Sequence, residues 1–241
     1  MPADFQVARR LDDPALPGAE NMARDAALLE VRSQPTLRFY SWTKPTLSLG
    51  YFQRAKNLPI SALQKRGYDC VRRKTGGKAI LHKEELTYSL CVPEIGAMAG
   101  GPKAAMEFLH QSFADELIQQ TNLDVKIRGN DRLSSDVRGS AWCFEDSSSL
   151  DLVLDGRKLL GSAARRSRGW TLFHGSLVIF PPDETQNIAG LGVFPDIDGF
   201  SQRLGNALNM DFQKGTWTEC EVASACRLKK SFEDLDSLNR L

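Results

Sequence analysis

The sequence has no strong excess of charge of either sign and no long hydrophobic run. Its formal net charge is only +1 over 241 residues, which argues against a general nucleic-acid binder, because such proteins carry a strong basic excess. No stretch approaches the unbroken apolar length of a membrane helix. The first residues, MPADFQVARRLDDPALPG, contain no apolar core, so no signal peptide is predicted. We expect a cytoplasmic protein that binds neither nucleic acid nor membrane.

Cysteine and histidine are too few and too scattered for a structural zinc site. The five cysteines form no Cys-x-x-Cys pair, and the chain has only three histidines. No metal is therefore predicted. An odd number of cysteines in a cytosolic chain favours free thiols over disulfides. One thiol could be a nucleophile, and the candidates are Cys70, Cys91, Cys143, Cys220 and Cys226.

The hydrophobic pattern predicts both helices and strands. Apolar residues at helical spacing predict helices over residues 21–32, 101–121, 200–208 and 219–228. Short apolar runs predict strands over residues 37–40, 47–51, 70–73, 78–81, 86–92 and 171–180.

The order of these elements predicts an α+β fold. Two extended runs flank Asp155-Gly156, the usual residues of a type I′ hairpin turn. Strands that cluster in hairpins, rather than alternating with helices, predict mostly antiparallel sheets with helices on one side. We expect a single domain over residues 1–241, with a core of about 20–182 and a helical C-terminal segment over 183–241.

Paired glycines interrupt a basic segment, VRRKTGGKAILH, at residues 71–82. Glycines let the backbone come close to a ligand and present bare N–H groups. The positive charge around them comes from Arg72, Arg73, Lys74 and Lys78. This pattern favours a cradle for a phosphate, a carboxylate or the pantetheine end of a carrier. A tight hairpin turn with solvated lysines is the alternative.

Three further residues could take part in catalysis if their side chains faced a pocket. Lys158 lies two residues past the hairpin turn, where it could hold a carbonyl oxygen or lower the pKa of a thiol. Cys143 precedes the same hairpin, so the two could meet in space. His174 stands within FHGSLVI. The alternatives are an outward-facing lysine, a small buried hydrophobic cysteine and a structural histidine.

Five strings resemble one family, the biotin/lipoate protein ligase catalytic domain. They span about residues 20–180 and read NMARDAALLE, RFYSW with PTLSLGYFQ, VRRKTGGKAILHKEELTYSL, CFEDSSSLDLVLDGRKLLGSAARR and FHGSLVI. The resemblance implies the fold of class II aminoacyl-tRNA synthetases and biotin protein ligases, with antiparallel strands flanked by helices and an acyl group bound in a tunnel. It also implies that the arginine/glycine loop covers the acyl donor.

The resemblance assigns roles to individual residues. It implies that Cys143 and Lys158 are catalytic. It implies that the acyl substrate is bound by Arg72, Arg73, Thr75, Gly76, Gly77, His82, Gly161, Ser162, Ala163 and His174.

The family contains two chemistries. Octanoyltransferases take octanoate from an acyl carrier protein through a cysteine thioester, whereas ligases use ATP to make an acyl-adenylate. The CF pair at Cys143 and the string HKEELTYS after Leu81 are similar to one transferase subgroup, and the chain has little room for the extra C-terminal domain of many ligases. Asp151, however, is similar to a ligase residue, and Lys83 and Ala164 depart from the usual pattern.

We therefore expect an acyltransferase that moves an octanoyl or lipoyl group onto the lysine of a lipoyl domain, without a cofactor. The expected partners are acyl carrier protein and lipoyl domain proteins, namely the E2 subunits of 2-oxoacid dehydrogenases and the H protein of glycine cleavage. ATP and magnesium would be needed only for the alternative of an ATP-dependent lipoate-protein ligase. A non-catalytic lipoyl-binding protein is the third alternative.

Overall fold

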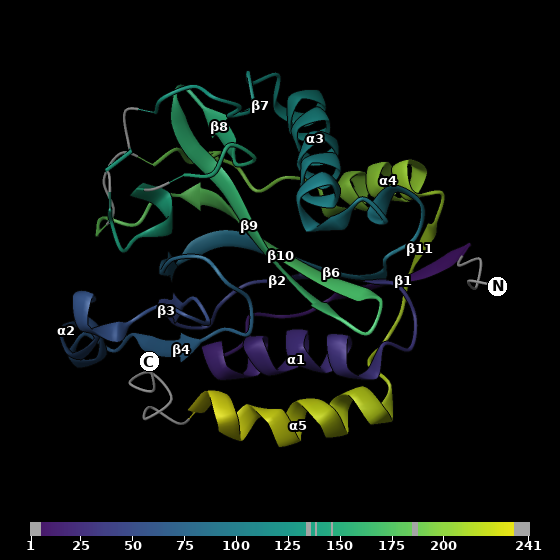
Figure 1. Cartoon of the computed structure of the whole chain (residues 1–241), viewed down its shortest axis with the longest axis horizontal. Helices are drawn as coiled ribbons and strands as arrows, with labels where there is room; N and C mark the ends of the chain where they lie inside the picture. Colours follow the sequence, from purple (N-terminus) through teal and green to yellow (C-terminus); the bar gives the residue numbers. More distant parts are fainter. Residues whose placement is uncertain (1–5, 134–135, 138, 146, 185–187, 234–241) are drawn as a thin grey trace.

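Two β-sheets form the centre of the protein, and helices cover both faces of the larger one (Figure 1). The computed structural model describes residues 6–133, 136–137, 139–145, 147–184 and 188–233. The larger sheet consists of β1 (Val7–Asp12), β2 (Thr36–Tyr40), β6 (Glu84–Pro93), β7 (Lys126–Ile127), β8 (Leu152–Leu154), β9 (Arg157–Ser167), β10 (Trp170–Phe180) and β11 (Asp211–Lys214). The smaller consists of β3 (Thr46–Leu49), β4 (Asp69–Arg72) and β5 (Ile80–His82).

The strand order is β11-β1-β2-β6-β10-β9-β8-β7 in the larger sheet and β4-β3-β5 in the smaller. From β2 to β7 all neighbours in the larger sheet are antiparallel, as predicted. Strand β1, however, runs parallel to both β2 and β11, and β3 runs parallel to β4. The sequence did not predict β1, because Arg9 and Arg10 break its apolar pattern, although both side chains are buried.

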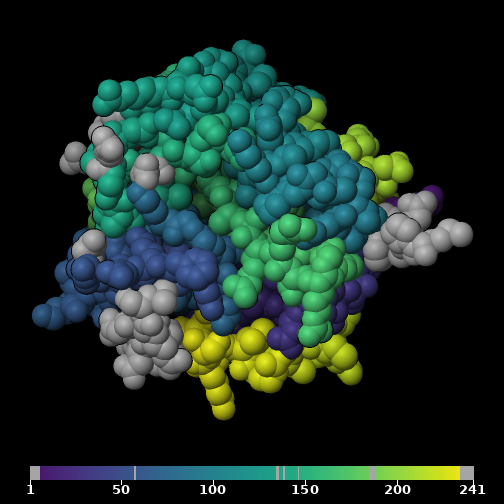
Figure 2. All heavy atoms as spheres, viewed as in Figure 1, coloured from purple at the N-terminus to yellow at the C-terminus, as the bar shows by residue number. Residues whose placement is uncertain are grey.

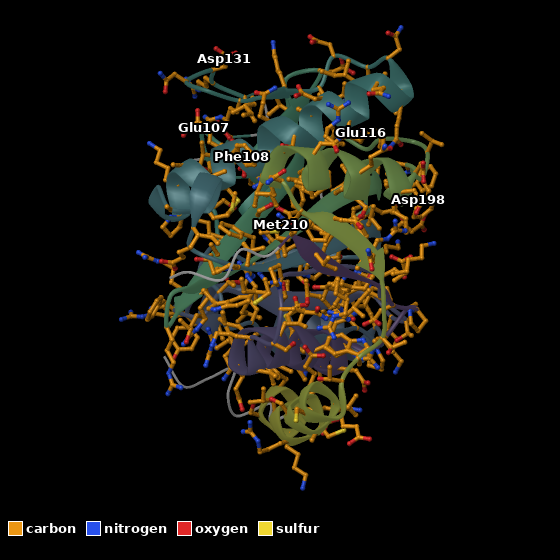
Figure 3. The ribbon with its side chains drawn as sticks, turned by 90° about the vertical axis from the view of Figure 1, so that its right-hand side faces the viewer. Glu107, Phe108, Glu116, Asp131, Asp198 and Met210 are labelled. Carbon is orange, nitrogen blue, oxygen red and sulfur yellow. The ribbon has the colours of Figure 1, made fainter. Side chains whose placement is uncertain are left out.

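All the described α-helices but one lie in two layers, which Figures 1 and 3 show from two directions; the exception, Ile60–Lys65, packs on the smaller sheet. The helices are α1 (Gly18–Val31), α2 (Ile60–Lys65), α3 (Gly101–Thr121), α4 (Ile197–Leu208) and α5 (Glu219–Glu233). Helices α3 and α4 cover one face of the larger sheet, and α1, backed by α5, covers the other. The α+β fold with flanking helices is confirmed, but the prediction that all helices lie on one side is wrong.

Strand β6 shows why helices cover both faces of the larger sheet. Its residues alternate between two cores: Leu90 packs with the α3 side and Cys91 packs with Leu28 of α1. The strand is buried from Thr87 to Pro93, but Thr87 and Ser89 are among its buried residues, so its sequence alternates between apolar and polar residues instead of forming a continuous hydrophobic run. No helix of the described residues is both long and apolar enough to cross a membrane.

The predicted hairpin turn is confirmed and fixes the register of the strands that follow. Asp155 and Gly156 have φ angles of 51° and 69°, the left-handed values that a type I′ turn requires. Leu154 pairs with Arg157 directly across the turn. Strand β9 therefore starts at a defined residue, and the facing of each of its side chains is determined.

Candidate active site

Cys143 and Lys158 meet in space. Lys158 Nζ lies 3.3 Å from Cys143 Sγ and 3.1 Å from the Cys143 carbonyl oxygen. The lysine stands near the start of β9, and the cysteine begins a short 3₁₀ turn, Cys143–Glu145. The Cys143 N–H donates to the carbonyl of Ala79 at 2.8 Å, and the Ala79 N–H donates to Ala141 at 3.1 Å. Backbone hydrogen bonds therefore hold Cys143 in place, and the pairing of β9 with β8 holds Lys158.

Lys158 is buried, so the alternative of an outward-facing strand lysine is wrong. Its side chain is 2% exposed, and its Nζ lies 2.7 Å from Oδ2 of Asp151. The Asp151 side chain is itself only 4% exposed. Burial by itself lowers the pKa of Lys158. The negative charges of Asp151 and then Cys143 raise it by more than burial lowers it, so the pKa lies above its ordinary value. Lys158 is therefore an ammonium ion. Breaking such a buried pair typically costs about 3–5 kcal/mol, well beyond the effect of losing a surface lysine.

Gly161 makes room for the lysine. A Cβ atom at this position would lie 2.5 Å from both Cε and Nζ of Lys158, and 3.3 Å from Asp151 Oδ1. Such distances are shorter than van der Waals contact, so a larger residue would displace the lysine. Gly161 thus stands at the site for a steric reason.

The other cysteines lack these surroundings. Burial raises the pKa of Cys70 to about 11 and also raises the pKa of Cys91. Both thiols are therefore held protonated and inert. Cys220 and Cys226 are exposed on α5. Among the described thiols, Cys143 alone is half-buried beside a fixed cation.

The arginine/glycine loop is held together by its own arginine. Arg73 is buried, and its guanidinium donates at 2.9 Å to the Ser48 carbonyl and at 2.8 Å to the carbonyls of Gly76 and Lys78. Burial lowers the pKa of Arg73, and the neighbouring Cys143 offsets part of that effect. Arginine nevertheless stays protonated in proteins. A large part of its hydrogen-bonding capacity thus shapes the loop.

Arg72 differs from its neighbour. It donates to the carbonyls of Gly50 and Gln53 at 2.8 and 2.7 Å, and it is not among the residues that line the two cavities described below. The Lys78 ammonium likewise donates to the carbonyl of Ser140. The basic side chains near the paired glycines therefore donate largely to backbone carbonyl oxygens of the protein itself.

His174 joins the glycine loop to a buried polar network. Its Nε2 and Thr75 Oγ1 are 2.6 Å apart, and its Nδ1 lies 3.3 Å from Asp25 Oδ2. Asp25 also accepts hydrogen bonds from Arg38 at 2.7 Å and Tyr40 at 2.9 Å. Burial lowers the pKa of His174 despite the opposing effect of Asp25. The histidine is therefore neutral and positions Thr75.

His82 is also fixed on every side. Its Nε2 lies 2.7 Å from Ser48 Oγ and its Nδ1 lies 2.7 Å from Glu85 Oε1. Its ring stacks on Trp42 with centroids 4.0 Å apart. These contacts make His82 part of a rigid wall, with no free nitrogen for proton transfer.

Two cavities adjoin the cysteine and lysine. The narrow, mostly apolar first cavity is lined by Met22, Tyr40, Trp42, Arg73, Gly77, Ile80, His82, Thr87, Cys143, Gly161, Ser162, Ala163, His174, Gly175 and Ser176. The wider second cavity, about 320 Å³, is lined by Gly76, Gly77, Pro102, Lys103, Met106, His110, Ser148, Leu150, Asp151, Ser162, Ala163 and Ala164. Figure 2 shows the surface hollowed between the blue segment that carries the glycine loop and the green segment that carries β9.

The two cavities share Gly77, Ser162 and Ala163. Cys143 faces the first and Asp151 faces the second, so the ammonium of Lys158 stands between them. The structure therefore brings together all the residues predicted from the sequence except Arg72 and Thr75. Thr75 contacts the site through His174.

His110 also lines the second cavity, although it stands outside the five strings that resemble the family. Its Nδ1 lies 2.5 Å from the Leu150 carbonyl, which can only accept, and its Nε2 lies 2.7 Å from Ser162 Oγ. Burial lowers the pKa of His110, so the ring is neutral. Ser162 must then donate to His110 and accept from Tyr88, whose hydroxyl is 2.8 Å away. In the sequence, His110 is a polar residue on the apolar face of the helix predicted over residues 101–121, and this position indicates a buried histidine with hydrogen-bond partners.

Asp25 is a second residue whose role the sequence did not predict. It lies on the largely apolar face of α1 that carries Met22, where Asn21 is the other polar residue, and it is buried. A buried carboxylate requires partners, so an acid on an apolar helix face indicates a polar network. Among the described residues there is no cluster of three or more histidine, cysteine, aspartate or glutamate side chains that could hold a metal ion.

A comparison with protein families now identifies this arrangement. The sequence model of the lipoyl protein ligase A/B catalytic domain matches residues 17–185. The chain belongs to this family. Relatives named octanoyltransferase LipM are 37% identical over 219 residues in Geobacillus kaustophilus and 30% identical over 271 residues in Brevibacillus brevis. These alignments cover 87% and 93% of this chain, and 76% and 95% of the relatives.

Solved structures of the family have the same fold. A lipoate-protein ligase A bound with ATP superposes with a TM-score of 0.78 at 22% identity, over 98% of this chain and 100% of that chain. A bipartite lipoate protein ligase from Thermoplasma acidophilum superposes with a TM-score of 0.75 at 20% identity, over 98% of each chain. At these identities the likeness shows the fold alone.

Proposed function

We propose that this protein is an octanoyltransferase that moves an octanoyl group from acyl carrier protein to the lysine of a lipoyl domain, through a thioester on Cys143. The observation that carries the proposal is the 3.3 Å contact between Lys158 Nζ and Cys143 Sγ beside an apolar cavity. The octanoyltransferase relatives support the acyl group and the reaction. The expected location is the cytoplasm.

The first step forms the acyl-enzyme. The Lys158 ammonium stabilises Cys143 as a thiolate, whose proton is released to water. The thiolate attacks the carbonyl carbon of the octanoyl thioester, the new S–C bond forms, and the bond to the carrier sulfur breaks. The carrier leaves as a thiolate, which takes a proton from water. Negative charge on the carbonyl oxygen is stabilised by fixed donors near Cys143, of which the Lys158 ammonium is the nearest described cation.

The second step transfers the acyl group to the acceptor. The neutral amine of the target lysine attacks the thioester carbonyl, the N–C bond forms and the S–C bond breaks. The amine loses a proton to water, and Cys143 leaves as the thiolate that Lys158 stabilises. The apolar first cavity suits the octanoyl chain, and the wider second cavity suits the pantetheine arm or the target lysine.

The rim of the second cavity supports an acidic partner such as acyl carrier protein. Lys103 is exposed at the start of α3, and Arg165 is exposed beside Ala164. The Arg165 guanidinium donates to the carbonyl of Lys74 at 2.7 Å, which places it over the glycine loop. Exposed positive charge at the entrance would steer an acidic carrier towards the cysteine. The proposed acceptors are the lipoyl domains of E2 subunits and the H protein.

The test is acyl transfer from octanoyl carrier protein to an apo lipoyl domain in ATP-free buffer. We expect the wild-type protein to modify the domain and Cys143→Ser to lose the activity by at least about 100-fold, because the thioester requires the thiolate. The matched control is Cys220→Ser, an exposed cysteine on α5 that should be replaceable. Intact-mass analysis should show one hydroxylamine-sensitive octanoyl adduct, absent in Cys143→Ser.

Two other outcomes would contradict the proposal. Modification that occurs only with free octanoate or lipoate, ATP and magnesium would identify a lipoate-protein ligase. No modification under either condition, with the acyl group or the lipoyl domain still bound, would identify a non-catalytic member of the family.

A further inference from the structure

The proposed reaction contains a chemical conflict. The enzyme transfers an acyl group from Cys143 to a lysine amine, yet its own Lys158 Nζ lies 3.3 Å from Cys143 Sγ. In an acyl-enzyme the thioester carbonyl carbon is bonded directly to this sulfur, so the lysine nitrogen would stand next to the carbon that an amine attacks. A neutral Lys158 amine would attack the thioester: the N–C bond would form, the S–C bond would break, and the amine proton would pass to the departing sulfur. The product would be a stable amide and an inactive enzyme.

The structure holds Lys158 in the form that cannot make this attack. An ammonium group has three donors, and each has an acceptor here: Asp151 Oδ2 at 2.7 Å, the Cys143 carbonyl at 3.1 Å and Cys143 Sγ at 3.3 Å. A neutral amine has only two hydrogens and could donate to at most two of these three atoms, whereas the ammonium can donate to all three. The Asp151 carboxylate is itself held by a 2.6 Å hydrogen bond from the Ser148 N–H.

Acylation makes Asp151 more important. Once Cys143 becomes a thioester, its sulfur no longer carries negative charge, and that contribution to the pKa of Lys158 is lost. The other groups that face Nζ are the Phe144 ring, whose centroid is 5.1 Å away, and His110, whose pKa is lowered by burial so that it is neutral. Among the described groups that contact Nζ, Asp151 is the carboxylate that remains. Without it, burial would dominate and lower the pKa of Lys158.

We propose that Asp151 is a positioning residue that keeps Lys158 as an ammonium ion in the acyl-enzyme, and thereby prevents the octanoyl group from moving from Cys143 onto the enzyme's own lysine. This inference rests on the proposed function, since it requires an acyl thioester on Cys143. It assigns the buried Asp151–Lys158 pair a second role beside thiolate stabilisation, namely the protection of the enzyme from its own chemistry.

The test compares Asp151→Asn with Asp155→Asn, the same substitution at an exposed turn residue of the same hairpin. Each protein is incubated with octanoyl carrier protein and no acceptor, treated with hydroxylamine and digested for mass spectrometry. Hydroxylamine cleaves thioesters and leaves amides. We expect wild type and Asp155→Asn to lose all label, and Asp151→Asn to retain an octanoyl amide at Lys158. Each unit by which the pKa of Lys158 falls increases the neutral amine about tenfold, so the amide should accumulate at least tenfold faster.

A conservative variant and a second measurement separate the remaining outcomes. Asp151→Glu keeps a carboxylate and should form less amide than Asp151→Asn. A thioester on Cys143 with no amide on Lys158 in Asp151→Asn would show this inference to be wrong. A wild-type protein without a thioester would instead contradict the proposed nucleophile.

If Asp151→Asn takes up no acyl group, nitrogen-15 NMR of the Lys158 ammonium decides the question. The signal is assigned by its loss in Lys158→Arg. We expect the pKa of Lys158 to be lower in Asp151→Asn than in wild type, and an unchanged pKa would overturn the inference.

Discussion

At the scale of single residues, the two neutral histidines make stability depend on pH. Burial lowers the pKa of both His110 and His174 below the ordinary value of 6.5. As the pH falls below about 6.5, the unfolded chain binds protons that the folded protein does not bind. Stability is therefore fully present above this pH and is lost as the pH falls towards the folded-state pKa values. Each histidine contributes at most about 1.4 kcal/mol per pH unit.

The expected result is a lower free energy of unfolding at about pH 5.5 than at about pH 7.5. His110→Gln should reduce this difference, because the variant lacks one of the two histidines. Urea unfolding at both pH values measures it, each protein being compared with itself. Asp25 does not interfere, since its pKa lies below 3.8 and its effect appears only in stronger acid. An equal loss of stability in His110→Gln and wild type would contradict a neutral His110.

At the scale of elements, the contact between the end of β3 and the glycine loop depends on Gly50. A Cβ atom there would lie 1.8 Å from the carbonyl oxygen of Gly77. A Cβ at Gly76, in contrast, would meet nothing within 4 Å. The two glycines, which look alike in the sequence, thus have different roles: one permits close packing and the other leaves the cavity open.

Gly50→Ala should therefore destabilise the protein by about 1–3 kcal/mol, because the loop must move away from β3. Gly76→Ala should change the free energy of unfolding by no more than about 0.5 kcal/mol. Denaturant unfolding of both variants measures the difference. Similar stabilities for the two variants would show that the loop yields without cost, and that its close packing on β3 does not define the site.

At the scale of the whole molecule, the C-terminal helix is tied to the first strand by a buried ion pair. Arg9 of β1 donates two hydrogen bonds to Glu221 of α5, at 2.8 and 2.6 Å. Helix α5 packs on α1, and Phe232 belongs to the same apolar cluster as Met22, which lines the first cavity. Segments near the two ends of the described chain therefore support the wall of the site.

Glu221→Ala should lower the free energy of unfolding by about 3–5 kcal/mol, because it leaves the Arg9 charge buried without its carboxylate. Glu219→Ala, an exposed residue in the first turn of the same helix, should cost no more than about 1 kcal/mol. Hydrogen exchange should locate the change, with faster exchange in α5 and α1 in Glu221→Ala alone. Unchanged protection of α5 would show that its apolar face suffices to hold it.

The surface charge also differs between the sides of the molecule. Figure 3 shows Glu116 and Asp198 on the side formed by α3 and α4, and both line a groove between these helices. The lining contains four carboxylates, those of Asp115, Glu116, Asp196 and Asp198, and one arginine, Arg203. This net negative charge would repel an acidic carrier protein, whereas the rim near Arg165 would attract it. The net charge of +1 conceals this asymmetry, because it sums over both sides.

The sequence by itself determined many of the local elements and the choice of the residues that we propose to react. Helix α3, from Gly101 to Thr121, follows from its own spacing of apolar residues, and the turn at Asp155-Gly156 follows from backbone preferences that act over a few residues. Cys143 and Lys158 were found because their strings resemble a family. None of these inferences required knowledge of a distant contact.

Only the tertiary structure decided which charges are buried and what they face. Asp151 and Lys158 are seven positions apart in sequence, and nothing in the sequence predicts that they pair, yet both are buried and 2.7 Å apart. Arg72 reads as a ligand, yet it holds a loop. The physical reason is that burial and the pairing of charges depend on segments brought together from distant parts of the chain, and residue type alone carries no record of those neighbours.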